Sequence, residues 1–215
     1  MRNYQKLLDE TINRHQLNNE IPKLLLHSCC APCSSYCIEY LSEYFEITVL
    51  YYNPNIFPED EYNYRMVEQK RFIEQFTAKY PIKLIEAPYT PEDFYAIAKG
   101  YEKLPEGGER CSRCYRLRLE YTARLARDLQ MDYFTTTLSI SPLKNAEKLN
   151  IIGDELGNEY GIQYLLSDFK KRNGYKRSVE LSKEYDMYRQ NFCGCVYSME
   201  EMKLREEKKI SGDKI

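Results

Sequence analysis

A short apolar run at residues 23–28, followed by the adjacent cysteines Cys29 and Cys30, constrains the fold more than any other stretch. Pro32 comes next and suits the first turn of a helix. The run therefore predicts a buried strand that delivers two thiols to its C-terminal end. Because ligands bind outside the carboxyl ends of strands in open α/β sheets, we expect a functional site there.

The same alternation of strand and helix recurs along the chain. Strands are expected at residues 23–28, 47–52, 82–86, 133–138 and 162–166, and helices at 32–45, 59–80, 91–98, 111–130, 145–160 and 178–185. This order predicts a single-domain α/β fold with a mostly parallel, doubly wound sheet of about five strands and helices on both faces. Residues 1–200 should form that domain, and residues 201–215 a charged, flexible tail.

The chemical role expected for the eight cysteines depends on the cellular compartment of the protein. The N-terminus has no apolar core of signal-peptide length, and no window resembles a membrane span, so we expect a cytoplasmic protein without membrane contact. In a reducing cytosol, cysteine clusters indicate metal binding or redox chemistry rather than a disulfide framework. The net charge of −2 means that any contact with nucleic acid must use a local basic patch.

Two pairs of cysteines supply four potential thiolate ligands. Cys111 and Cys114 lie three residues apart at the start of a predicted helix, so both sulfurs should face one side. The helix dipole and the neighbouring arginines should lower their pKa values. With Cys29 and Cys30 they make the usual ligand count for an iron–sulfur cluster or a structural zinc, and the spacing leaves both open.

Two further cysteines follow the first pair. Cys37 should face the core at helical spacing, whereas Cys33 stands nearer the helix N-terminus, where the dipole stabilises a thiolate. We therefore expect a packing role for Cys37 and leave the role of Cys33 open.

The turn Cys193-Gly194-Cys195 differs from the other pairs. One intervening residue is a poor span for a structural zinc pair, and a disulfide closed across it would be strained and easily reduced. The pair is typical of a two-electron redox couple, with a second metal or two unrelated surface thiols as alternatives.

A basic run, residues 170–177, carries five cations and no acid after the fifth predicted strand. Further cations surround the Cys111–Cys114 pair, namely Arg110, Arg113, Arg116 and Arg118. Cations beside a redox centre favour a phosphate-bearing substrate such as tRNA.

Five motifs together resemble the QueH family of epoxyqueuosine reductases over roughly residues 22–200. They are residues 24–35 (LLLHSCCAPCSS), 111–119 (CSRCYRLRL), 134–142 (FTTTLSISP), 167–175 (SDFKKRNGY) and 188–198 (YRQNFCGCVYS). The resemblance implies reduction of epoxyqueuosine to queuosine at the tRNA wobble position, with a [4Fe–4S] cluster and no cobalamin. It also implies a Rossmann-like fold similar to the PP-loop and nucleotidyl-transferase (HUP) group, although Cys29-Cys30 stands where those proteins have a Gly-rich phosphate loop.

The resemblance also assigns roles to residues. It implies that the cluster ligands are Cys29, Cys30, Cys111 and Cys114, and that Cys193 and Cys195 form a redox-active pair, with a second, mononuclear iron left open. The implied partners are tRNA carrying epoxyqueuosine in its anticodon and an electron donor that the motifs do not identify. The reaction is a two-electron reduction in which the epoxide oxygen leaves as water, and the candidate proton donors are Tyr115, Asp168 and the thiol pair.

Two other functions compete with this interpretation. A zinc-stabilised four-cysteine RNA-binding module without redox turnover would explain the thiolates and the basic run, but it leaves Cys193 and Cys195 without a purpose. A thiol–disulfide oxidoreductase acting on proteins would need its C-x-x-C after the first strand, and the Cys111–Cys114 motif comes much later.

Overall fold

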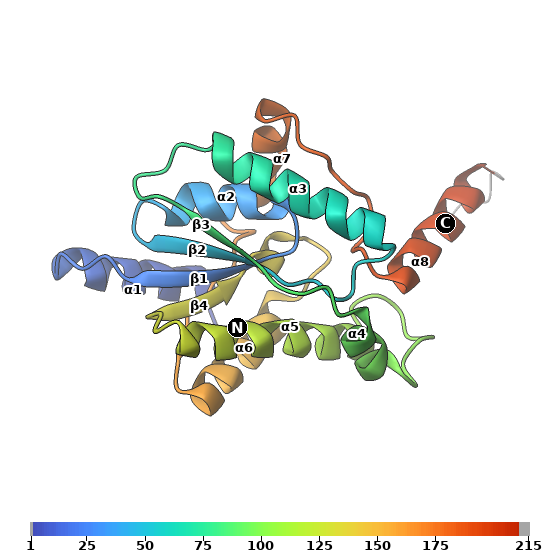
Figure 1. The fold of residues 1–215 in the computed structure, drawn as a ribbon, viewed down its shortest axis with the longest axis horizontal. Coiled ribbons are helices and arrows are strands. Elements are labelled where there is room, and N and C mark those ends of the chain that lie inside the picture. Colours follow the sequence, from blue (N-terminus) through green and yellow to red (C-terminus); the bar gives the residue numbers. More distant parts are fainter. Residues whose placement is uncertain (1, 211–215) are drawn as a thin grey trace.

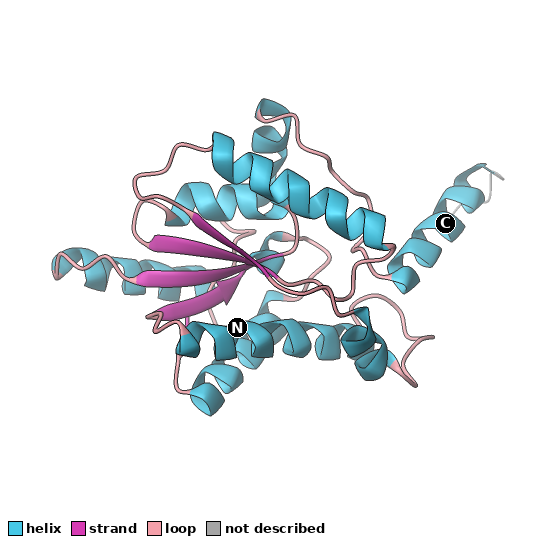
Figure 2. Cartoon of the chain, viewed as in Figure 1, coloured by secondary structure: helices cyan, strands magenta, loops and turns pink. Residues whose placement is uncertain are grey.

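The computed structural model describes residues 2–210 and has a five-stranded, all-parallel sheet at its centre (Figures 1 and 2). The strands are β1 (Lys23–Ser28), β2 (Glu46–Tyr51), β3 (Lys83–Glu86), β4 (Tyr133–Thr136) and β5 (Gln163–Tyr164). The α-helices are α1 (Tyr4–Leu17), α2 (Ala31–Leu41), α3 (Glu59–Gln75), α4 (Pro91–Ala98), α5 (Glu109–Asp128), α6 (Ala146–Tyr160), α7 (Gly174–Glu184) and α8 (Val196–Ile210), and a 3-10 helix, η1 (Thr137–Ile140), follows β4.

The sheet is buried between two layers of helices, as the apolar strands require. Along β1, Leu24 and Leu26 pack into one core with α2 and α3, while Leu25 packs into the other with α5 and α6. This division matches Figure 1, where α2, α3 and α7 lie above the sheet and α5 and α6 below it. The single-domain, doubly wound α/β fold predicted from the alternation is confirmed.

The strand order β3-β2-β1-β4-β5 places a switch point between β1 and β4. From β1 the chain continues on one side through β2 and β3, and it returns to β4 and β5 on the other side. Connections that leave in opposite directions open a crevice at the carboxyl ends of the two central strands. Cys29 and Cys30 follow β1 and therefore lie at that crevice.

Several element boundaries differ from those predicted. Helix α3 ends at Gln75 instead of residue 80, because Phe76 turns to an extended conformation and its ring packs 5.4 Å from that of Phe72. Strand β4 ends at Thr136, whose hydroxyl accepts a hydrogen bond from Leu138 N and starts the 3-10 helix.

The C-terminal part of the chain also differs in detail. Helix α7 begins at Gly174 rather than residue 178, and α8 runs across the boundary expected at residue 200. Within that tail, residues 211–215 lie outside the described part of the chain. Across residues 2–210, no helix combines the length and the apolar character needed to cross a membrane.

Candidate active site and metal centre

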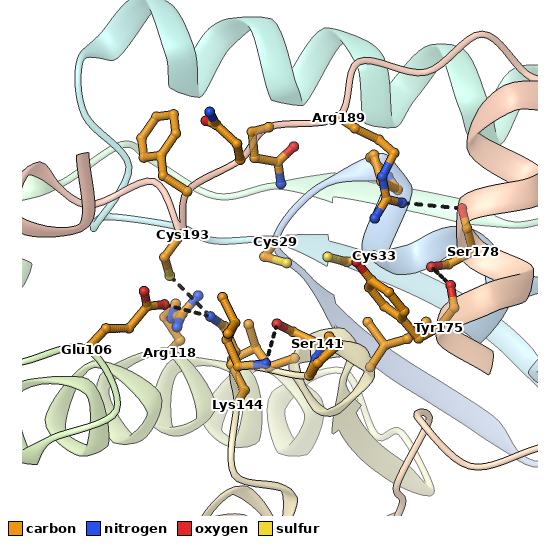
Figure 3. Close-up of a pocket in the computed structure, with 18 residues that line it drawn as sticks. Cys29, Cys33, Glu106, Arg118, Ser141, Lys144, Tyr175, Ser178, Arg189 and Cys193 are labelled. Atoms are coloured by element: carbon orange, nitrogen blue, oxygen red, sulfur yellow. Dashed lines mark hydrogen bonds and ion pairs between the residues drawn. The ribbon is translucent and has the colours of Figure 1, made fainter. Parts of the chain in front are cut away.

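A cavity of about 390 Å³ opens at the carboxyl ends of β1 and β4 (Figure 3). Its walls come from the β1–α2 turn, helix α5, the loop after η1, helix α7 and residues 189–193. Three cysteines line it, Cys29, Cys33 and Cys193. Segments that are far apart in sequence thus bring sulfur to one hollow of a size typical of small-molecule sites.

The first group of sulfurs is built by the β1–α2 turn. The sulfur atoms of Cys29, Cys30 and Cys33 all lie within 4.8 Å of one another. Cys30 is the extended residue that precedes α2, and Pro32 and Cys33 form the first turn of the helix, so Cys33 folds back over the strand end. Such a buried group of thiols can bind a metal, and Cys33 belongs to it by position.

Hydrogen bonds among these thiols set their proton affinities. Contacts from Cys29 and Cys33 hold the pKa of Cys30 well below its usual range, and the same interactions raise the pKa of Cys33. Gln190 adds a hydrogen bond from its amide Nε2 to Cys30 Sγ at 2.9 Å. Cys30 is therefore the member of the group best prepared to be a thiolate.

The cysteines of α5 carry raised pKa values, contrary to the expectation of lowered ones. Burial raises the pKa of Cys111, and it raises that of Cys114 to about 12. Arg110 acts to lower the pKa of Cys111 and Arg118 that of Cys114, but burial is the larger effect on each thiol. Desolvation thus outweighs the helix dipole at these two thiols.

The turn with Cys193 and Cys195 gives its two thiols different surroundings. Lys144 Nζ donates to Cys193 Sγ at 3.3 Å, and Glu106 lies 3.9 Å from the same ammonium group. Cys195 is buried next to Ser198, and burial raises its pKa. All eight cysteines are free thiols, so Cys193 and Cys195 are not joined in this structure.

Two buried arginines stand among the sulfurs. Burial would lower the pKa of Arg118, but the thiols of Cys114 and Cys193 raise it, with a further contribution from Cys29. Arg118 Nε donates to Cys114 O at 3.3 Å, and its side chain lines the cavity together with Cys29 and Cys193. Arg65 belongs to α3, on the opposite face of the sheet from α5. Its charge lies near Cys30, and its Nη1 donates to Cys193 O at 3.3 Å.

The sequence interpretation missed Arg65, Lys144 and Gln190. It named Arg118 only as one of the cations near the Cys111–Cys114 pair. Arg118 follows Cys114 by four residues, so helical spacing could have placed it on the cysteine face. Lys144 follows the fourth strand and could have been found from the strand-end rule. Arg65 and Gln190 have no local signal, because their partners are 128 and 160 residues away.

The two other candidate proton donors lie in different surroundings. Tyr115 is buried, and burial raises its pKa. Asp168 forms an ion pair with Lys170 at 3.2 Å and lines a separate pocket beside the N-terminus of α6. Lys144 lines both that pocket and the sulfur cavity, whereas Asp168 does not line the sulfur cavity.

The basic run is largely neutralised by the protein itself. Arg172 pairs with Asp9 at 2.6 Å and Arg177 pairs with Glu39 at 2.6 Å, while Lys170 pairs with Asp168. Of its five cations, Lys171 and Lys176 are exposed and have no ion-pair partner in the described chain. The run therefore offers less free charge than its sequence indicates.

Comparison with known families decides where the chain belongs. Residues 24–201 match the family described as epoxyqueuosine reductase QueH. The chain belongs to the QueH family of epoxyqueuosine reductases. The matched QueH segment contains every cysteine described above, together with Arg65, Arg118 and Lys144.

Several curated QueH proteins cover most of the chain. The epoxyqueuosine reductase QueH of Streptococcus pyogenes serotype M1 is 43% identical over 198 residues, which are 91% of this chain and 78% of the relative. The protein of the same name from Staphylococcus epidermidis is 44% identical over 200 residues, 91% of this chain and 84% of the relative. The Thermotoga maritima QueH is 36% identical over 182 residues, 82% of this chain and 90% of the relative.

Proposed function

We propose that this QueH-family protein is an oxidoreductase that reduces epoxyqueuosine to queuosine in tRNA, using a [4Fe–4S] cluster without cobalamin and a redox-active Cys193–Cys195 pair. The observation that carries the proposal is that Cys29, Cys33, Cys193 and Arg118 line one cavity, while Arg118 Nε donates to the backbone of Cys114. Family membership names the substrate, and the wobble position and the cytoplasm, where thiols stay reduced, are parts of the proposal.

The donor set fits an anionic metal–thiolate group. We assign the ligands to Cys29, Cys30, Cys111 and Cys114, with Cys33 as a competitor because its sulfur lies within the tight group. One buried nitrogen of Arg118, Nη2, has no hydrogen-bond partner, and this cation would offset the negative charge of four thiolates. When bound, the cluster supplies one-electron transfer between an external donor and the cavity.

The protein's own groups can supply the electrons and protons that the reaction needs. An epoxide that becomes an alkene takes up two electrons and two protons and releases its oxygen as water. Oxidation of the Cys193 and Cys195 thiols to a disulfide releases two electrons and two protons, so the balance closes, and the external donor then reduces the disulfide. Lys144 holds a proton on Nζ, 3.3 Å from Cys193 Sγ and inside the cavity, where it can reach the departing oxygen.

The test is iron and sulfide analysis of protein purified without oxygen, joined to an assay on tRNA that carries epoxyqueuosine. We expect about four irons and four sulfides per chain, lost in Cys114→Ala and kept in Cys193→Ala. Both variants should fail to form queuosine. Cys37→Ala is the control, because Cys37 is a fully buried cysteine that packs in the core away from the cavity.

The alternatives predict other results. Stoichiometric zinc with no visible thiolate–iron absorption would favour the zinc-stabilised RNA-binding module and contradict the reductase. Loss of iron in Cys33→Ala, with iron kept in Cys111→Ala, would move the cluster onto the tight group of the β1–α2 turn. Retention of full activity in Cys193→Ala would remove the redox pair from the mechanism.

A further inference from the structure

The cavity has two ends, and the proposed chemistry uses only one of them. Figure 3 shows Cys193, Lys144, Glu106 and Arg118 at one end, and Tyr175, Ser178 and Arg189 at the other. Cys29 and Cys33 lie between these ends. The Tyr175 end contains no thiol pair and no acid, so it calls for a separate explanation.

Tyr175 presents an aromatic ring to the cavity. The residue is 41% exposed and lies at the start of α7. The preceding Gly174 packs so closely against Phe169 O and the Tyr36 ring that a Cβ atom would not fit. The backbone that carries Tyr175 is therefore fixed, while its ring remains open to a ligand.

Arg189 places a planar cation over this ring. Its guanidinium carbon lies 5.7 Å from the Tyr175 ring centroid. Nη1 donates to Ser178 O at 3.4 Å and to Ser182 Oγ at 3.1 Å, which orients the group. Among residues 2–210 no carboxylate pairs with Arg189, so its charge is left for another partner. Aromatic rings and guanidinium planes are the surfaces on which unpaired nucleobases stack.

A polar atom nearby also lacks a partner. Gln190 lines the cavity and gives its Nε2 to Cys30, but its buried Oε1 accepts no hydrogen bond. A buried carbonyl without a donor is costly, and a ligand N–H group would satisfy it. Guanine-like bases carry such donors on their amino group.

We propose that Tyr175 and Arg189 form a nucleobase-binding subsite that stacks on the modified base, with Gln190 Oε1 accepting from its edge. The inference rests on the proposed function, because it seats the base at one end while the attached epoxide reaches Cys193 at the other. A cavity of about 390 Å³ accommodates a single nucleoside-sized group. The base must therefore leave the stack of its loop to enter.

The test measures binding separately from reduction. A fluorescein-labelled anticodon stem-loop RNA with guanine at the wobble position is titrated with the purified protein, and anisotropy gives Kd. Loss of one stacking partner in Tyr175→Ala should weaken binding about tenfold or more, whereas Tyr175→Phe should bind like wild type. Arg189→Gln should weaken binding in the same direction. Tyr95→Ala is the matched control, because Tyr95 is 42% exposed on α4 and does not line the cavity.

A second RNA shows whether the base itself is recognised. With an abasic wobble nucleotide, wild type and Tyr175→Ala should bind alike, because no base remains to stack. An equal weakening with both RNAs would assign Tyr175 to the RNA backbone and overturn the subsite, as would unchanged Kd in Tyr175→Ala and Arg189→Gln. A wild-type protein that binds the guanine RNA in this pattern but reduces no epoxyqueuosine would refute the proposed function and keep the subsite.

Discussion

Arg65 and Arg118 are both 1% exposed, yet their surroundings differ in kind. Arg65 Nε donates to Glu61 at 2.7 Å, its ring partner is Phe192 at 5.1 Å, and it holds the backbone of Cys193. Arg118 Nε meets only the carbonyl of Cys114, and within the described chain no carboxylate pairs with it. A carboxylate balances the charge of Arg65, whereas the charge of Arg118 has no carboxylate partner among residues 2–210.

The difference separates a structural cation from a functional one. Arg65 secures residues 186–195 to α3, and other α3 side chains act alongside it: Glu68 accepts from Tyr188 N at 3.0 Å and Arg71 donates to Asp186 O at 3.0 Å. In the described part of the chain, the hydrogen bond and the ring contact of the Arg118 side chain stay within its own helix, with Cys114 and Tyr115. A buried cation without a carboxylate costs free energy, which indicates that its benefit comes with an anionic group bound beside it.

The largest expected effect is at Arg65. Arg65→Met leaves Glu61 without its partner and frees the Cys193 backbone, so the free energy of unfolding should fall by about 3 kcal/mol. Urea denaturation followed by circular dichroism measures it, with Arg65→Lys as the milder variant that keeps the charge. A loss of unfolding free energy below about 1 kcal/mol would contradict the structural role given to Arg65.

Gly194 tests the same attachment through the backbone. Its φ is +116°, and an added Cβ would lie 3.0 Å from Arg65 Nη1 and 3.1 Å from Ile56 Cγ1. Gly194→Ala should therefore cost about 1–3 kcal/mol in unfolding free energy. Gly107→Ala is the control, because Gly107 has φ +86° with open space around it and suffers strain alone. Equal losses in both variants would show that contact with Arg65 is unimportant.

Arg118 should behave in the opposite way to Arg65. In metal-free protein, Arg118→Met should leave the free energy of unfolding within about 1 kcal/mol of wild type, because a charge without a carboxylate partner is replaced by a side chain of similar length. The same variant should retain less iron after anaerobic reconstitution. Destabilisation of metal-free protein as large as that of Arg65→Met would refute the distinction.

The smallest effect is a dependence on pH. The hydrogen bond from Arg71 lowers the pKa of Glu68, and the bond from Tyr188 N acts in the same direction. A carboxyl with a lowered pKa in the folded state adds stability above its unfolded pKa of about 4.3, and this is lost as the pH falls below that value. Glu68→Gln should therefore lose less stability than wild type between about pH 5 and pH 3. Parallel curves for the two proteins in urea titrations would count against the prediction.

The fold could be predicted because its signals are local. The helix predicted at residues 145–160 is α6, which begins after Asn145, whose side chain accepts from Lys148 N, and ends at Gly161 with φ +69°. The lengths were less predictable, since β5 has two residues where five were expected. The length of β5 is set by its pairing with β4, and local sequence preferences do not predict where such pairing stops.

The site was only partly visible in the sequence for the same reason. Cysteine spacing identifies Cys29-Cys30 at the carboxyl end of β1 and Cys111–Cys114 in the first turns of α5, because both are short patterns with known chemistry. The C-x-x-C spacing of Cys30 and Cys33 agrees with their place in one group, whereas no local pattern shows that burial raises the pKa of Cys111 and Cys114. The pKa values of these thiols depend on which segments, distant in sequence, pack over them and exclude water.

The contact between Gln190 and Cys30 spans 160 residues. Loops of that length close late, since local structure forms before distant segments meet. The β1–α2 turn therefore exists on the ribosome long before the segment that covers it, and its thiols are open to solvent during that time. Closure of the contact with Gln190 therefore ends the period in which the Cys30 thiol, 1% exposed in the folded chain, is open to solvent.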